Sequence, residues 1–267
     1  KGSSYSLPGV RDAEGYTFMG WSTKPMQSVS PQYEAEEKIT VNGNVDLYAV
    51  VFNRTTETDL TEDQLPQVDI YKYKQVIFVG DSRTEFMENV LTGMGESATK
   101  NVKFVCSAGK GLDWFTTTGW AQLYSIVQHD SNSILSKKTA VIFNFGVNDL
   151  SKSADYAEYY NWIAPQLKSK GCELYFMSVN PVNRLMLPNA GRADRSEAAV
   201  RSFNQYMKAN LSSAYTYIDM YSYLKSTGYS FASDHYGTGT VDDGLHYTTR
   251  TYKRIFAKCM DSLRVPA

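Results

Sequence analysis

Three short motifs spread along the chain hold the residue types that acyl transfer requires. A serine hydroxyl attacks a carbonyl carbon only when a base removes its proton, and imidazole titrates close enough to neutral pH to be that base. A carboxylate bonded to the imidazole orients the ring and stabilises its protonated form. We therefore predict Ser82 as the nucleophile, His246 as the base and Asp243 as the partner of His246. The motifs are Gly80-Asp81-Ser82, Gly146-Val147-Asn148-Asp149 and Asp243-Gly244-Leu245-His246.

Acyl transfer also needs hydrogen-bond donors for the negative charge that builds on the former carbonyl oxygen. We expect the backbone N–H of Ser82, the side-chain amide of Asn148 and one glycine N–H to form this oxyanion hole. Gly109 and Gly111 both qualify by position, and the sequence does not choose between them. Each motif alone is a weak signal, but chance would produce all three in one chain roughly once in a thousand sequences of this composition.

Residues beside the motifs are candidates for contact with a substrate or for bracing the loops. Asp81 and Asp149 are expected to brace loops by hydrogen bonds. Arg83 could bind an anionic group of a substrate, or it could be an ordinary arginine on a helix surface. Trp114 and Tyr247 could each contact a substrate or belong to the hydrophobic core. The candidate substrate contacts are Arg83, Trp114, Asn180, His235 and Tyr247.

A parallel sheet wrapped by helices would bring these motifs to one edge. Each of five short runs is almost continuously apolar, as expected of strands covered on both faces, and three longer segments carry helical apolar spacing. Strands that alternate with helices predict an α/β fold with a doubly wound parallel sheet. In such sheets ligands bind beyond the carboxyl ends of the strands, where the first two motifs fall. The runs are 75–79, 102–106, 140–145, 173–179 and 215–219, and the helical segments are 156–167, 195–211 and 248–263.

Residues 75–265, with these motifs, resemble the SGNH hydrolases, also called GDSL esterases. The resemblance implies a flavodoxin-like, three-layer fold with a five-stranded parallel sheet, and it implies the roles already given to Ser82, Asn148, Asp243 and His246. The second block of the family carries the oxyanion glycine and usually an asparagine. Here Cys106 or Ser107 stands in place of that asparagine.

Residues 1–52 read instead as short strands and turns, too few to form a large core. Four features resemble the Listeria–Bacteroides repeat over residues 5–52: Leu7-Pro8, the run from Gly15 to Lys24, Tyr33, and the run from Val45 to Val50. The repeat is a β-grasp-like unit of bacterial surface proteins, and its usual first strand would lie before Lys1. We expect a module at 1–52, a polar linker at 53–74 and a hydrolase domain at 75–267.

Composition narrows the class of protein. The 267 residues are 42% hydrophobic and 21% charged with a net charge of -1, which is typical of a globular protein and excludes bulk electrostatic binding of nucleic acid. No apolar stretch approaches the roughly 20 residues of a membrane span. Cys106, Cys172 and Cys259 lack zinc-ligand spacing and give no disulfide framework. The sequence also contains no Gly-x-x-x-x-Gly-Lys phosphate loop and no His-Glu-x-x-His zinc motif, so no metal or cofactor is predicted. Cys106 and Cys172 are expected to be small buried hydrophobes.

These observations favour a secreted or cell-surface bacterial serine esterase, whose leader would lie outside these residues. It would remove short acyl groups, with acetyl expected, from a carbohydrate or cell-wall glycan through an acyl-enzyme. Residues 1–52 could contact the cell wall. The alternatives are an acyltransferase, lipase or thioesterase of the same fold, or a non-catalytic surface adhesion protein that uses the hydrolase-like part as a scaffold.

Overall fold

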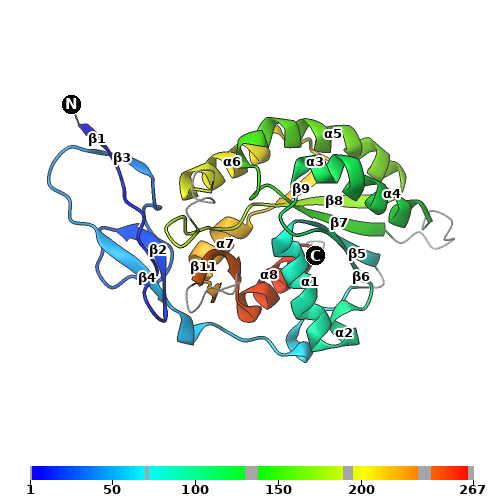
Figure 1. Cartoon of the computed structure of the whole chain (residues 1–267), viewed down its shortest axis with the longest axis horizontal. Coiled ribbons are helices and arrows are strands. Elements are labelled where there is room, and N and C mark those ends of the chain that lie inside the picture. The colour runs from blue at the N-terminus through cyan, green and yellow to red at the C-terminus, as the bar shows by residue number, and fades with distance from the viewer. Residues whose placement is uncertain (1, 70–71, 130–137, 189–194, 234–241, 264–267) are drawn as a thin grey trace. The chain divides into compact units, whose positions relative to one another are not determined.

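The computed structural model describes residues 2–69, 72–129, 138–188, 195–233 and 242–263 (Figure 1). The chain folds into two compact units. The first unit contains Lys1–Asp59, Asn180–Ser202 and Tyr221–Thr251, and the second contains Leu60–Val179, Phe203–Met220 and Tyr252–Ala267.

The second unit is built on a five-stranded parallel sheet, as the sequence predicts. Its strands lie in the order β6-β5-β7-β8-β9, so the first strand of the sheet has the second and third as its neighbours. Ligands bind at such a switch point in doubly wound sheets. The strands are β5 (Tyr73–Gly80), β6 (Val102–Cys106), β7 (Lys138–Asn144), β8 (Cys172–Met177) and β9 (Tyr215–Ile218).

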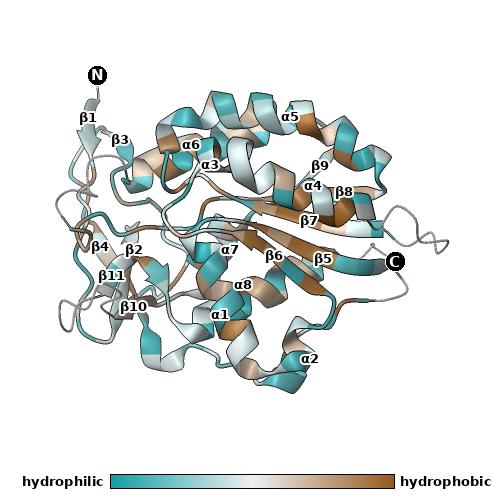
Figure 2. Cartoon of the chain, turned by 45° about the vertical axis from the view of Figure 1, so that its right-hand side comes forward, coloured by the Kyte–Doolittle hydropathy of each residue, from teal (hydrophilic) through white to brown (hydrophobic). Residues whose placement is uncertain are grey.

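Burial along the strands follows their place in the sheet. The run from Val76 to Val79 in β5 has no exposed surface, because strands lie on both sides of it and helices cover its faces. Figure 2 shows the same concentration of apolar residues in β5 and β7. The expectation that Cys106 is buried is wrong: β6 is an edge strand, and Cys106 is half-buried with its Sγ 3.3 Å from Oε2 of Glu88. Cys172 is buried as expected.

Helices cover both faces of the sheet (Figure 1). On one face the ring of Phe143 in β7 lies 4.8 Å from that of Tyr160 in α5, and on the other Phe78 in β5 lies 5.8 Å from Phe256 in α8. None of the helices within the described ranges is long and apolar enough to cross a membrane. The α-helices within the described residues are α1 (Ser82–Met94), α2 (Glu96–Thr99), α3 (Leu112–Trp114), α4 (Trp120–His129), α5 (Ser153–Ser169), α6 (Glu197–Asn210), α7 (Met220–Thr227) and α8 (Thr249–Ser262), and a π-helical turn at Phe115–Gly119 joins α3 to α4.

The first unit contains short antiparallel strand pairs. In its N-terminal part β1 (Ser3–Ser6) pairs with β3 (Lys38–Val41), and β2 (Tyr16–Ser22) pairs with β4 (Tyr48–Asn53). A third pair joins β10 (Phe231–Ser233) to β11 (Asp242–Tyr247). The side chains of Met19 and Val50 are completely buried and belong to the core of this unit. The N-terminal region is therefore β-rich, as predicted, and the same unit also holds the strand that carries Asp243 and His246.

Candidate active site

Ser82 is the first residue of α1 and follows β5 after a sharp turn. Gly80 ends the strand where any Cβ would collide with the side chain of Thr84, so only glycine allows the chain to turn so closely. Asp81 caps the helix, and its carboxylate accepts the N–H of Arg83 at 3.0 Å. Asp81 thus braces the turn, as the sequence predicts. Ser82 lies at the positive end of a 13-residue helix, where developing negative charge is stabilised.

The loop after β6 is tied to the start of α1. The N–H of Ser107 donates to the carbonyl oxygen of Gly80 at 3.3 Å, and the N–H of Ala108 donates to Oε2 of Glu85 at 2.6 Å. The role of Glu85 was not predicted. Its position three residues after Ser82, on the same side of α1, is the signal in the sequence that could have revealed it.

Asn148 and Asp149 tie the loop after β7 to the loop after β6. The side-chain amide of Asn148 donates to the carbonyl oxygen of Lys110 at 2.8 Å, and Oδ2 of Asp149 accepts the N–H of Leu112 at 2.9 Å. The hydroxyl of Tyr156 donates to Oδ1 of Asp149 at 2.7 Å. Burial raises the pKa of Asp149 above its ordinary value, although these two bonds oppose the rise. Asp149 therefore braces the loops, as the sequence predicts.

The two candidate oxyanion glycines are required for different reasons. Gly111 begins α3, and any Cβ on it would collide with the carboxylate of Asp149. Gly109 has a φ of 69°, a left-handed conformation that favours glycine, and open space where a Cβ would lie. The loop therefore positions Gly111 by close contact and Gly109 by backbone conformation.

Asp243 and His246 form a buried pair in the first unit. Oδ2 of Asp243 lies 2.6 Å from Nδ1 of His246, and the two side chains are 2% and 4% exposed. Oδ1 of Asp243 accepts the N–H of Leu245 at 2.8 Å and that of His246 at 2.7 Å. Gly244 between them has a φ of 67°, which lets the chain fold tightly around the carboxylate. The sequence motif thus becomes a single turn that orients the ring.

This arrangement selects a tautomer of His246. A carboxylate only accepts hydrogen bonds, so Nδ1 carries the proton that it donates to Asp243. The neutral ring then presents its lone pair at Nε2, which is the atom that can remove a proton from a nucleophile. The pair therefore has the geometry of a general base held by its orienting carboxylate.

The structure places four of the candidate substrate contacts, and His235 lies outside the described residues. Arg83 is only 2% exposed, so it is not the helix-surface arginine that the sequence also allowed. Trp114 is half-buried, with its ring 6.1 Å from that of Phe145. Asn180 is buried. Contact of these residues with a substrate stays a prediction.

Tyr247 has the surroundings of a packed residue. Its ring stacks on Phe231 at 5.4 Å, and its hydroxyl donates to the carbonyl oxygen of Pro181 at 2.5 Å. Its contact with a substrate likewise stays a prediction. Among the described residues, no group of three His, Cys, Asp or Glu side chains could hold a metal ion.

Comparison with known families identifies two regions of the chain. The model of the GDSL-like lipase/acylhydrolase family matches residues 76–259, which include every one of the motifs. The chain belongs to this family. A second model, that of the Listeria-Bacteroides repeat domain, matches residues 1–50. Both resemblances stated from the sequence are therefore confirmed, and this GDSL-family member is an ester hydrolase of the SGNH type.

Solved structures similar to this GDSL hydrolase share little of its sequence. A Bacteroides fragilis protein proposed to be an acylhydrolase is 16% identical, with a TM-score of 0.49 over 75% of this chain and 92% of its own. A Slackia heliotrinireducens protein proposed to be an SGNH hydrolase is 12% identical, with a TM-score of 0.48 over 72% and 100%. The catalytic domain of Streptococcus pneumoniae peptidoglycan O-acetyltransferase A is 16% identical, with a TM-score of 0.43 over 72% and 92%. A search of curated proteins finds no match.

Proposed function

We propose that this GDSL hydrolase is a serine esterase in which Ser82 is the nucleophile, His246 the base and Asp243 the residue that orients it. The observation that carries the proposal is the buried Asp243–His246 pair, whose 2.6 Å bond at Nδ1 orients the imidazole ring. In the proposed reaction Nε2 takes the proton of the Ser82 hydroxyl as its oxygen attacks the ester carbonyl. His246 then returns that proton to the departing alcohol, which leaves the acyl group on Ser82. In the second half of the reaction His246 takes a proton from water as the water attacks the acyl-enzyme, and it gives that proton to the Ser82 oxygen as the free acid departs.

The oxyanion of the tetrahedral intermediate would be bound by the N–H of Ser82, the amide of Asn148 and a glycine N–H. We assign the glycine as Gly111. Both of its neighbouring peptides are bonded, the carbonyl of Lys110 to Asn148 and the N–H of Leu112 to Asp149. An oxyanion hole works because its donors are fixed before the charge develops, and these bonds fix the peptide at Gly111 relative to Asn148.

The proposed substrate is an acetylated glycan outside the cell. The support is the Listeria–Bacteroides repeat, a unit of bacterial surface proteins, which shares a compact unit with the Asp243–His246 pair. An enzyme located at or beyond the cell surface meets polysaccharides, and these commonly carry acetyl esters. We therefore propose a secreted or cell-surface bacterial enzyme whose repeat contacts the wall.

The esterase proposal is tested with p-nitrophenyl esters of increasing acyl length, from acetate through butyrate and octanoate to laurate. Wild type is expected to cleave acetate fastest, and Ser82→Ala is expected to lose cleavage of every ester. Equal rates for wild type and Ser82→Ala would show that the nucleophile is wrong. A preference for laurate would replace the glycan substrate with a lipid and leave the nucleophile in place.

Hydrolysis and acyl transfer can be distinguished by their products, which are free acetate and a newly acetylated glycan. Acetylated xylan and O-acetylated peptidoglycan are incubated with the enzyme, with and without an excess of deacetylated glycan. The esterase releases free acetate at the same rate in both cases. Acetate that appears on the added glycan instead would identify a transferase with the same residues.

A further inference from the structure

We propose that the Listeria–Bacteroides repeat holds the Asp243–His246 turn in its catalytic geometry, through Asp12 of the repeat and Asn183. The two residues are positioning residues, and this inference rests on the proposed function because it assigns them to the proposed base. All of the residues involved belong to the first compact unit.

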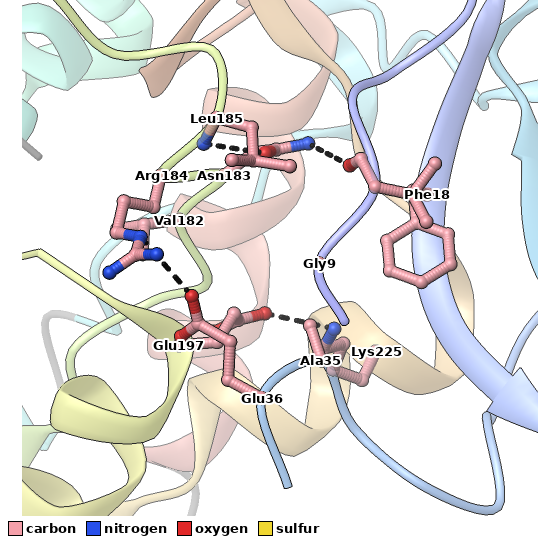
Figure 3. Close-up of a pocket in the computed structure, with 11 residues that line it drawn as sticks. Gly9, Phe18, Ala35, Glu36, Val182, Asn183, Arg184, Leu185, Glu197 and Lys225 are labelled. Carbon is pink, nitrogen blue, oxygen red and sulfur yellow. Dashed lines mark hydrogen bonds and ion pairs between the residues drawn. The ribbon is translucent and has the colours of Figure 1, made fainter. Parts of the chain in front are cut away.

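Asn183 bonds to the repeat with its side chain and to the catalytic turn with its main chain. Its side-chain amide donates to Oδ1 of Asp12 at 2.8 Å and to the carbonyl oxygen of Val10 at 3.0 Å. Its backbone N–H donates to the carbonyl oxygen of Gly244 at 2.8 Å. Figure 3 shows the Asn183 side chain directed toward the repeat, while Oδ1 accepts the N–H of Leu185. One buried residue thus joins two segments far apart in the sequence.

Gly244 connects the position of Asn183 to that of the Asp243–His246 pair. A Cβ on Gly244 would collide with the carbonyl oxygen of Asn183, so the two backbones are packed in direct contact. Gly244 lies inside the turn that Asp243 closes by accepting the N–H groups of Leu245 and His246. A movement of Asn183 therefore moves the turn that sets the direction of the imidazole.

Asp12 is itself held rigidly. Its side chain is completely buried, Oδ2 is paired with the Arg54 guanidinium at 2.6 Å, and Oδ1 also accepts the N–H of Phe18 at 3.0 Å. Arg54 is held in turn by a 2.9 Å bond to the hydroxyl of Thr17. A carboxylate with this many partners has little freedom, so it can fix the amide of Asn183 in one orientation.

Two further groups of contacts join the repeat to other parts of the first unit, one at Arg184 beside Asn183 and one at Lys225 in α7. Nε of the Arg184 guanidinium lies 3.3 Å from Oε1 of Glu36. Figure 3 marks this ion pair with a dashed line. The Lys225 ammonium, almost fully buried, lies 2.8 Å from Glu34 and 3.0 Å from Glu197, and donates to the carbonyl oxygen of Met19 at 2.6 Å. Buried ion pairs such as those of Lys225 add little net stability but disfavour alternative arrangements, and here they favour one packing of the repeat against α6 and α7.

The effect on catalysis follows from the tolerance of the reaction to misplacement. A shift of about 1 Å in a catalytic group can cost about a hundredfold in rate. A role as a spacer alone does not account for the buried Asp12 carboxylate, which is bonded to the same residue, Asn183, that packs on Gly244. The Asp12–Asn183–Gly244 contacts give the repeat a function inside the enzyme.

The test is a double-mutant cycle in the full-length chain. Asp12→Ala and Asn183→Ala are each expected to lower kcat for p-nitrophenyl acetate by about tenfold or more, with KM within about twofold. Both substitutions break the same hydrogen bond between Asn183 and Asp12. The double variant Asp12→Ala/Asn183→Ala is therefore expected to be no slower than the slower of the two single variants. Asp12→Asn keeps an oxygen for the Asn183 amide and is expected to lose less activity than Asp12→Ala. The control is Asp46→Ala, an exposed aspartate of the same repeat, expected to match wild type.

A pH profile separates positioning from a general loss of structure. A displaced Asp243 stabilises the imidazolium less, so the acid limb of kcat/KM is expected to move to lower pH in Asn183→Ala. Folded variants with wild-type kcat and an unmoved acid limb would overturn the proposal, as would additive losses in the double variant. If Asn183→Ala does not fold, Asn183→Ser, with a side chain too short to reach Asp12, carries the same test.

An NMR titration of the His246 ring keeps this inference distinguishable from the proposed function. If wild type has no esterase activity, the proposed function fails, but the ring can still be titrated in wild type and Asn183→Ala. A lower imidazole pKa in the variant supports the positioning role without any assay of activity. An identical titration in both proteins would contradict it.

Discussion

The carboxylate of Asp243 bonds to both the ring and the main chain of His246. Oδ2 lies 2.6 Å from Nδ1 of the imidazole, while Oδ1 accepts the backbone N–H of the same residue at 2.7 Å. One side chain therefore sets the path of the chain and the orientation of the ring together. This double contact is possible because the carboxylate stands three residues before the histidine, and it leads to the first prediction.

Asp243→Asn is expected to lower kcat for p-nitrophenyl acetate about a thousand- to ten-thousandfold while the protein stays folded. An asparagine can still accept the two backbone N–H groups with its oxygen, but its NH2 group would then face Nδ1. Nδ1 would become the acceptor and Nε2 would carry the proton, so the ring could no longer act as a base. Steady-state kinetics beside the control Asp46→Asn measure the effect, and a loss below tenfold would contradict the tautomer assignment.

Gly244→Ala is expected to destabilise the protein by about 1–3 kcal/mol and to reduce activity further than the loss of folded protein explains. Its φ of 67° disfavours a side chain, and the new Cβ would meet the carbonyl oxygen of Asn183. Gly43→Ala is the matched control, because a Cβ there meets no atom within 4 Å. Urea unfolding measures both variants. Equal midpoints would mean that the turn is looser than the structure indicates.

Asn148→Ala is expected to lower kcat about a hundred- to thousandfold with little change in KM, because its amide would serve the transition state more than the bound ester. The 2.8 Å bond to Lys110 sets the direction of this amide in the structure. Asn44→Ala, at an exposed asparagine, is the control and is expected to match wild type. A rise in KM with unchanged kcat would assign Asn148 to substrate binding instead.

Lys225→Met is expected to destabilise the protein by about 3–5 kcal/mol near neutral pH, because it removes the buried cation that pairs with both Glu34 and Glu197. The attraction of Arg201 remains, but the ammonium within 3.0 Å of both carboxylates is lost. Burial lowers the pKa of Lys225, but the attraction of Glu197 and the other acidic groups outweighs it, and the pKa lies above its ordinary value. Lys38→Met, at an exposed lysine, is the control and is expected to change stability by less than about 0.5 kcal/mol.

The same variant should show a defined dependence on pH. Burial raises the pKa of Glu34 even with Lys225 present, and removing the cation raises it further. The folded variant then binds a proton more tightly than the unfolded chain does. Its stability is recovered below the ordinary carboxyl pKa and lost as pH rises through the folded pKa. The deficit against wild type in urea unfolding should be smaller near about pH 5 than near about pH 8. A deficit independent of pH would contradict this account.

The sheet could be predicted from the sequence because its central strands are apolar on both faces. The runs at 75–79 and 140–145 correspond to β5 and β7, whose burial requires such continuous patterns. The pair β1 and β3 could not be found in this way, because their side chains are mostly exposed and carry no apolar pattern. The π-helical turn at Phe115–Gly119 likewise depends on packing between segments and leaves no local pattern.

The site shows the same division between local and distant contacts. Asp243, Gly244 and His246 stand together in the sequence, so their turn could be expected from the motif alone. The bond between Asp12 and Asn183 joins residues 171 positions apart, and neither residue type indicates its partner. The sequence does not decide whether Arg83 lies on a helix surface or contacts a substrate, because a single residue after a strand carries no signal of its burial. Contacts of this kind become visible only when the segments are packed together.

Labelling with a fluorophosphonate probe, read by mass spectrometry of the modified peptide, tests the central claim most directly. The probe forms a covalent bond to a serine oxygen only when that serine is activated by a base. Wild type is expected to be labelled at Ser82, His246→Ala about a thousandfold more slowly or not at all, and Ser82→Ala nowhere. Labelling of folded His246→Ala at the wild-type rate, or no labelling of folded wild type, would contradict the claim that Ser82 and His246 act as one catalytic unit.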